Sequence, residues 1–165
     1  MARGDAEGPI TLSVLDRLID LEPKSQQEAP LTRAQSLRRL KAALKRDLEW
    51  LLNTRRTPEE LPGPAPELER SLYHYGLPDF TGLSLRSTRD QQKITKTLES
   101  TIALFEPRLA NVRVRMEPLG EHARMLRFVI EGLLRIDPAP ERVSFDTVLE
   151  LSSGQYQVRG EPGAG

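Results

Sequence analysis

Apolar residues recur every three or four positions in the first two thirds of the chain, the spacing typical of amphipathic helices. The longest such stretch is 33–56, where leucines repeat with steps of three and four. A shorter stretch covers 12–21, and another runs from about 89 to 105 behind the capping pair Ser87 and Asp90. The leucines of the long stretch are Leu37, Leu40, Leu44, Leu48 and Leu51. The pattern predicts helices that each bury one apolar stripe.

After Pro107 the period changes from 3.6 to 2. Apolar residues alternate with charged ones from Val112 to Glu117, and the stretches 126–136, 143–151 and 155–159 also read as strands. The last two are close enough to form a hairpin over "SSG". We therefore expect an α+β fold in which N-terminal helices pack on a small, mainly antiparallel C-terminal sheet.

Proline-rich stretches divide these elements. The segment "EPKSQQEAP" at 22–30 reads as a polar linker, and the prolines of "TPEELPGPAPE" at 57–67 exclude a continuing helix. We expect a flexible N-terminus at 1–9, a single domain at 10–159 and a disordered tail at 160–165.

Composition narrows the possible environments and partners. Lys+Arg and Asp+Glu are equal at 24 each, so no net field draws the chain to nucleic acid or to an anionic membrane. Cysteine is absent, which excludes disulfides and thiolate zinc sites. No apolar run is long enough for direct membrane insertion, and the start has no signal-peptide core. We expect a cytoplasmic protein.

Candidate catalytic chemistry is sparse. His74 and His122 are the two histidines, so a histidine metal site or a catalytic triad has little support. No glycine-rich phosphate-binding motif occurs, and the scattered acids give no basis for choosing a hydrolytic pair. The basic residues of 38–46 read as a solvated helix face. The residues by themselves predict an interaction module that is not an enzyme and needs no cofactor.

Four segments, in this order, carry a resemblance: "LSVLDRLID", "LKRDLEWLLNTRR", "SLYHYGLPDFTG" and "FEPRLANVRV". Together they resemble the TssE family of type VI secretion baseplate wedge proteins, within the wider gene-25-like family of contractile phage tail baseplates. The resemblance covers roughly residues 10–159. The third segment and the arginine-rich helix end are more typical of the secretion branch.

The family's signature motif corresponds to Glu106, Pro107 and Arg108. The resemblance implies that this segment joins helix to sheet and docks on the helical core bundle of other wedge subunits. Pro107 fixes φ and lacks an N–H, so we expect it to end the helix at a set place. The charged pair is expected to be largely solvated in the free protein and to serve as an interface plug. The alternative is an internal salt bridge that only braces the corner.

The resemblance also implies that the sheet holds the first sheath ring by sharing strands. We expect the hairpin at 143–159 to do this through its backbone, with Val143, Phe145, Tyr156 and Val158 as partner-binding residues. The alternative is an edge blunted by Arg159 and Glu161.

The partners that the resemblance implies are the wedge subunits TssF, TssG and TssK and the sheath subunits TssB and TssC. It implies recruitment from the cytoplasm to an apparatus associated with the inner membrane, where the chain would be a structural part. Two other functions stay open from the sequence, namely a lysozyme-like glycan hydrolase and a wedge protein of a phage-derived injection particle.

Overall fold

The computed structural model describes residues 10–19, 30–58, 63–117 and 125–160. The chain divides into two compact units, 1–44 and 45–165. The predicted flexible N-terminus at 1–9 and all but the first residue of the predicted disordered tail lie outside the described residues. The single domain at 10–159 stays a prediction.

The first unit contains α1 (Val14–Leu18) and the beginning of α2 (Arg33–Asn53). Ser13 caps α1, because its hydroxyl accepts a hydrogen bond from the backbone N–H of Asp16. A reciprocal capping box starts α2: Gln35 accepts from the backbone of Thr32 at 2.9 Å, and Thr32 accepts from the backbone of Gln35 at 3.3 Å. Both predicted helices are therefore present, but α1 has only five residues and buries none of them, so the prediction that it buries an apolar stripe is wrong.

The leucine ridge of α2 is buried as predicted at Leu40, Leu44, Leu48 and Leu51. The helix ends at Asn53, however, and the prediction that it continues through Arg56 is wrong. The Arg56 N–H donates to the Leu77 carbonyl at 3.0 Å, and the Leu77 N–H donates to the Thr54 carbonyl at 2.8 Å. Pairing with Leu77 therefore replaces the next helical turn.

Gly76 makes this pairing possible. Its φ is +107°, and a Cβ at this position would lie 2.3 Å from the Thr54 carbonyl oxygen. Only glycine fits this backbone conformation at this approach distance. The next residue, Leu77, is fully buried. The "YGLP" of the sequence is thus a close junction between the end of α2 and the loop that follows.

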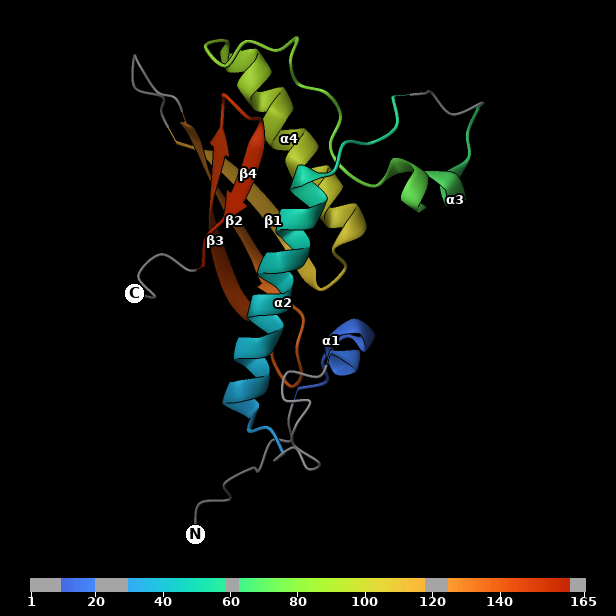
Figure 1. Ribbon diagram of the computed structural model, residues 1–165, viewed down its shortest axis with the longest axis vertical. Coiled ribbons are helices and arrows are strands. Elements are labelled where there is room, and N and C mark those ends of the chain that lie inside the picture. Colours follow the sequence, from blue (N-terminus) through green and yellow to red (C-terminus); the bar gives the residue numbers. More distant parts are fainter. Residues whose placement is uncertain (1–9, 20–29, 59–62, 118–124, 161–165) are drawn as a thin grey trace. The chain divides into compact units, whose positions relative to one another are not determined.

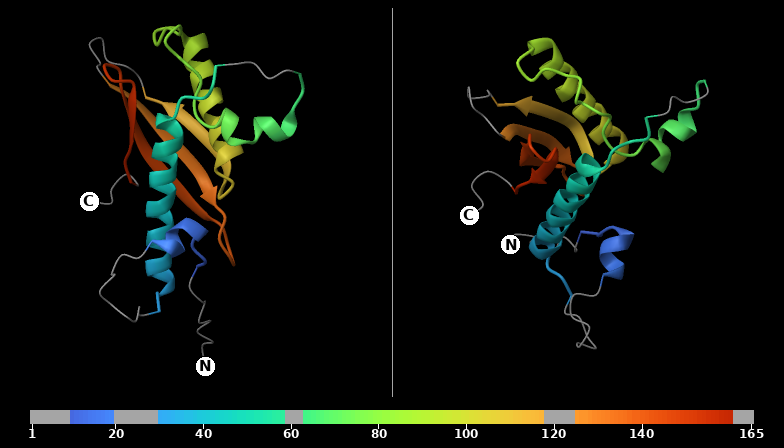
Figure 2. Two further views of the ribbon diagram at one scale, coloured as in Figure 1. Left: turned by 45° about the vertical axis from the view of Figure 1, so that its right-hand side comes forward. Right: turned by 45° about the horizontal axis from the view of Figure 1, so that its top comes forward.

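Short elements lead from this junction to the second long helix. They are α3 (Pro66–Glu69) and η1 (Leu72–His74), and they precede α4 (Thr88–Phe105). The predicted cap of α4 is confirmed, because the Ser87 hydroxyl accepts from the Asp90 N–H at 3.3 Å. The buried side of α4 includes Ile94, Leu98 and Ile102. Figures 1 and 2 show α4 lying beside β1.

Four strands form one antiparallel sheet in the order β1-β2-β3-β4. Their bounds are β1 Leu109–Met116, β2 Met125–Leu134, β3 Glu141–Glu150 and β4 Gln155–Val158. Alternate residues of every strand are buried. The predicted α+β fold with an antiparallel C-terminal sheet is therefore confirmed. In the described part of the chain, no helix is both long and apolar enough to cross a membrane.

Candidate functional site: the charged corner between helix and sheet

The segment that joins α4 to β1 forms a sharp corner. Glu106 is the last residue to bond into the helix, since its N–H donates to Ile102 at 2.8 Å. Pro107 follows and is exposed, and the Leu109 N–H then donates back to the Glu106 carbonyl at 3.1 Å. Because Pro107 has no N–H and a fixed φ, the helix stops here and β1 begins two residues later. The predicted change from helix to strand is confirmed.

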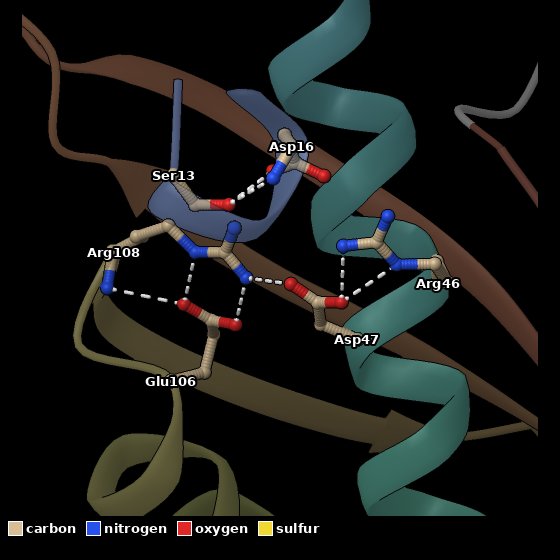
Figure 3. Close-up of polar contacts among 6 residues, drawn as sticks. All are labelled: Ser13, Asp16, Arg46, Asp47, Glu106 and Arg108. Atoms are coloured by element: carbon tan, nitrogen blue, oxygen red, sulfur yellow. Dashed lines mark hydrogen bonds and ion pairs between the residues drawn. The ribbon is translucent and has the colours of Figure 1, made fainter. Parts of the chain in front are cut away.

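Arg108 turns back from the start of β1 and lies between two carboxylates (Figure 3). Its Nε donates to Glu106 Oε1 at 2.6 Å, and its Nη2 donates to Glu106 Oε2 at 2.5 Å. The same Nη2 lies 2.6 Å from Asp47 Oδ2 on α2. This is a two-point arginine–carboxylate pair with a second carboxylate attached, an arrangement that fixes the orientation of the guanidinium.

The network continues along α2. Arg46 donates from Nε to Asp47 Oδ1 at 2.9 Å, and its guanidinium lies 5.0 Å from the centre of the Trp50 ring. An arginine at this distance over an aromatic face is attracted by the negative potential of the ring. Trp50 is nevertheless 53% exposed. The charged corner therefore extends to an exposed aromatic side chain.

Glu106 and Arg108 are more buried than we predicted. Glu106 is 5% exposed, and the side chain of Arg108 is 23% exposed. The expectation that the pair is largely solvated in the free protein is therefore wrong, and the internal salt bridge offered as an alternative is present. The reason is that Asp47, 61 positions away in sequence, contributes a second carboxylate to the corner. Hydrogen bonding to Glu106 raises the pKa of Arg108, so the guanidinium stays charged.

The aromatic loop reaches the same corner. The rings of Tyr75 and Phe105 meet edge to face, with centroids 5.3 Å apart. Burial raises the pKa of Tyr75, and the negative charges of Asp47 and Glu106 raise it further. Two of the motifs that carried the resemblance, the aromatic loop and the Glu-Pro-Arg segment, are thus parts of one structure.

This arrangement is suited to holding backbone segments together rather than to catalysis. Both carboxylates of the corner are engaged by arginines, whereas a glycan hydrolase needs one carboxyl group free to give up a proton. Among the described residues, no group of three or more His, Asp or Glu side chains is placed to hold a metal ion.

The other predicted partner-binding residues lie on β3 and β4. Val143, Phe145, Tyr156 and Val158 all have buried side chains, between 2% and 4% exposed. Their side chains therefore belong to the core, and both backbone groups of Tyr156 already bond Asn53, so partner binding by these residues stays a prediction. Of the two residues suggested to blunt this edge, Glu161 lies outside the described residues, and the Arg159 N–H donates to the Asp146 carbonyl at 2.6 Å.

The sequence interpretation missed two residues of these sites. Asp47 directly follows the basic run that reads as a solvated helix face, but it bonds Arg108. Asn53 was not singled out, yet its side chain bonds both backbone groups of Tyr156. A lone acid in a basic run is a weak signal for the first, and no local pattern marks the second.

Comparison with known proteins fits this structure. A search of curated proteins found no match. The family model for the baseplate wedge protein gp25 matches residues 38–139, which is more than half of the chain and includes the charged corner. This family is a structural one, in agreement with a corner whose acids are bound by arginines. The chain belongs to the gp25-like family of baseplate wedge proteins, the family of TssE.

Proposed function

We propose that the chain is a structural wedge subunit in the baseplate of a type VI secretion system. In this role it docks on the other wedge subunits, TssF, TssG and TssK, through the charged corner. It also anchors the first ring of the sheath subunits TssB and TssC through its sheet. The single observation that carries the proposal is the family match over the corner and the first two strands of the sheet, β1 and β2.

Two features of the corner support docking there. The network of Glu106, Arg108 and Asp47 fixes the corner before any partner arrives, so little ordering entropy is lost on binding. Pro107 is exposed at the tip of this fixed corner, where a partner can reach it.

Trp50 adds an apolar anchor to the same surface. It lies one helical turn from Asp47 and is held against Arg46, so its ring is exposed and also restrained. Exposed tryptophans with an ordered arginine neighbour are frequent energetic centres of protein interfaces. We therefore expect the wedge contact to include Trp50.

Replacing Trp50 tests the docking role without breaking the corner. Trp50→Ala should change the free energy of unfolding by no more than about 1 kcal/mol, because the ring is half exposed and packs on one side chain. Binding to co-expressed TssF and TssG should weaken by about 2 kcal/mol or more, the effect of losing an interface anchor. Urea unfolding and quantitative pull-down measure the two quantities.

Met125→Ala is the matched control, because Met125 is 57% exposed and lies at the end of β2 opposite to the corner. It should leave wedge binding unchanged. Equal wedge binding by Trp50→Ala and the original chain would remove this surface from the proposal. Failure of the original chain to bind any wedge subunit would remove the secretion role itself.

A phage-derived injection particle is the second candidate, because the matched family description names a baseplate wedge protein without naming the machine. The corner and the sheet would act in the same way there. Flanking genes distinguish the two: genes for TssF, TssG and TssK place the chain in a secretion system, and genes for tail fibres and a tail tube place it in a particle.

A further inference from the structure

The exposed face of the sheet has a hollow at the end where β1 begins. Its volume is about 550 Å³, and its described walls come from three neighbouring strands of the second unit. Neither the charged corner nor β4 contributes a described residue to these walls. The residues that matter for its chemistry are Asn111 and Arg113 of β1, Glu131 and Leu133 of β2, and Arg142 and Ser144 of β3.

A β-bulge distorts β1 beside the hollow. Ala110 pairs with Leu133 of β2. Three positions later Arg113 pairs with Glu131, which is only two positions along β2, so β1 has one extra residue here. In a regular strand the residue after Ala110 would face the core, whereas Asn111 is exposed and has a left-handed φ of +53°. The bulge thus adds a polar residue to the wall, in the way that bulges re-aim side chains at functional sites.

Two arginines of the hollow have no counter-charge within the described part of the chain. Arg113 and Arg142 are exposed, and neither side chain forms a hydrogen bond or ion pair with a residue that the structure describes. The acid that lines the hollow, Glu131, is already engaged, because it accepts from Nη2 of Arg115 at 2.5 Å. The hollow therefore carries an excess of positive charge.

The register of the strands gives the spacing of these two charges. Arg113 lies opposite Glu131 on one side of β2. Arg142 lies on the other side of β2, opposite Leu133, two residues further along. At a strand spacing of about 4.8 Å and a rise of about 3.4 Å per residue, the two arginine Cα atoms are about 12 Å apart. Their long side chains can converge on two carboxylates about 7 Å apart, the spacing of alternate residues in an extended segment.

An acidic protein segment fits this surface better than nucleic acid does. Surfaces that bind nucleic acid combine a continuous basic track with aromatic rings on which bases stack. The described lining of the hollow contains no aromatic side chain, and it includes the carboxylate of Glu131. Leu133, which lies between the two arginines, offers contact to an apolar side chain instead. The segment that fits has two acids with one apolar residue between them.

We propose that this hollow binds an extended acidic segment of a neighbouring baseplate subunit. Two carboxylates of the segment bond Arg113 and Arg142, and the apolar residue between them lies on Leu133. This contact goes beyond the proposed function, because docking at the charged corner and anchoring of the sheath do not use this hollow. Only the identity of the neighbouring subunit rests on the proposed function.

The isolated full chain tests the chemistry of the hollow. A synthetic peptide in which glutamate alternates with leucine should shift the NMR signals of the Arg113, Leu133 and Ser144 amides, and added salt should weaken its binding. Replacing both arginines, by Arg113→Gln and Arg142→Gln, should lower the affinity for the peptide at least about tenfold, because both charge pairs are lost. The fold should be unaffected, since neither side chain has a described partner.

Arg127→Gln is the matched control for the peptide titration. Arg127 lies on the same face of β2 but is already 3.9 Å from the carboxylate of Glu117. Its replacement should change the affinity for the peptide less than about twofold. Three results would overturn the proposal: no shift at the amides of the hollow, an equal loss of affinity in the control, or tighter binding of a single-stranded oligonucleotide at the same amides.

Cross-linking in the assembled wedge tests the partner. A carbodiimide joins an amine to a carboxylate in direct contact with it, so Arg113→Lys and Arg142→Lys each place a reactive amine at the hollow. In a complex with co-expressed TssF, TssG and TssK, both amines should cross-link to acids of one segment of a partner. Cross-links only to Glu131 of the same chain, or none in a complex that forms, would overturn the proposal. Failure of the complex to form would remove the proposed function, and the peptide titration would still decide whether the hollow binds an acidic segment.

Discussion

The charged corner and the first part of β3 lie at the same end of the sheet, since Leu109 pairs with Leu134 and Leu134 pairs with Glu141. They use their polar groups in opposite ways. The corner directs its charges inward, where Arg108 bonds Glu106 and Asp47. The β3 edge directs the backbone groups of Ser144 outward, toward a position with no described strand. One region is fixed by side-chain bonds, and the other has no described strand beside it.

The two regions also differ in how conspicuous they are in the sequence. The Glu-Pro-Arg segment is the most distinctive part of the sequence, and its charged side chains bond one another and Asp47 of α2. The β3 edge has no distinctive residues, because any residue except proline supplies the backbone groups of a strand edge. A conspicuous motif here builds a fixed corner, and an ordinary strand leaves backbone groups without a described partner strand.

The largest effect is expected from removing Glu106. Glu106→Ala leaves the guanidinium of Arg108 in a half-buried site with only Asp47 as a counter-charge. Breaking a buried pair in this way should lower the free energy of unfolding by about 3 kcal/mol, near the lower end of such effects because Asp47 remains. Urea unfolding of the isolated chain measures the loss.

Glu131→Ala is the matched control for that measurement. Glu131 also pairs with an arginine, Arg115, at 2.5 Å, but the two side chains are 44% and 68% exposed. An exposed pair contributes about 0–1 kcal/mol, so this variant should be close to the original chain. Equal effects of the two substitutions would show that the corner pair acts as a surface pair, and the contrast between the regions would be lost.

A smaller effect is expected at Tyr156, which closes the core beside the capped edge. Burial raises its pKa to about 12, from 10.0. The folded form holds the phenol proton more tightly than the unfolded chain does. The stability that the protonated phenol contributes to the fold is therefore complete below pH 10 and is lost as the pH rises toward 12. Relative to Tyr156→Phe, the original chain should lose roughly 2.5 kcal/mol of unfolding free energy over this window, at 1.36 kcal/mol per pKa unit.

Near pH 7 the same two proteins should be almost equally stable. The Tyr156 hydroxyl has no hydrogen-bond partner among the described residues, so its removal breaks no bond there. A large loss of stability in Tyr156→Phe at neutral pH would show that the hydroxyl is hydrogen-bonded. The packing around Tyr156 would then differ from the one described above. Paired urea titrations at neutral pH and near pH 12 give both numbers.

Periodicity predicted most of the fold because each element here has its own repeat. The leucine ridge of α2, the cap at Ser87 and the alternation after Pro107 are local signals, and local signals can be read from sequence. The end of α2 could not be read this way. It depends on Leu77, which is more than twenty residues away and reaches Thr54 only because Gly76 allows the approach.

The residues of the candidate site could be predicted from the sequence, but the side chains that they contact within the chain could not. Glu106 and Arg108 were identified from their motif, but their burial depends on Asp47, which belongs to another helix. The hairpin was identified from alternation and turn residues. Which of its backbone groups face outward depends on the length of β4 and on the cap at Asn53. Both are tertiary facts without a local pattern.

Hydrogen exchange of the isolated chain tests the contrast between the two regions most directly. Ser144 and Phe145 are neighbours on β3, but the Phe145 N–H faces β2 and the Ser144 N–H faces the other side, where no described strand lies. We predict fast exchange at Ser144 and slow exchange at Phe145, at Tyr156 under its Asn53 cap, and at Arg108, whose N–H donates to Glu106 Oε1 at 3.2 Å. Slow exchange at Ser144 together with fast exchange at Arg108 would contradict the account, because the edge would then be closed and the corner open.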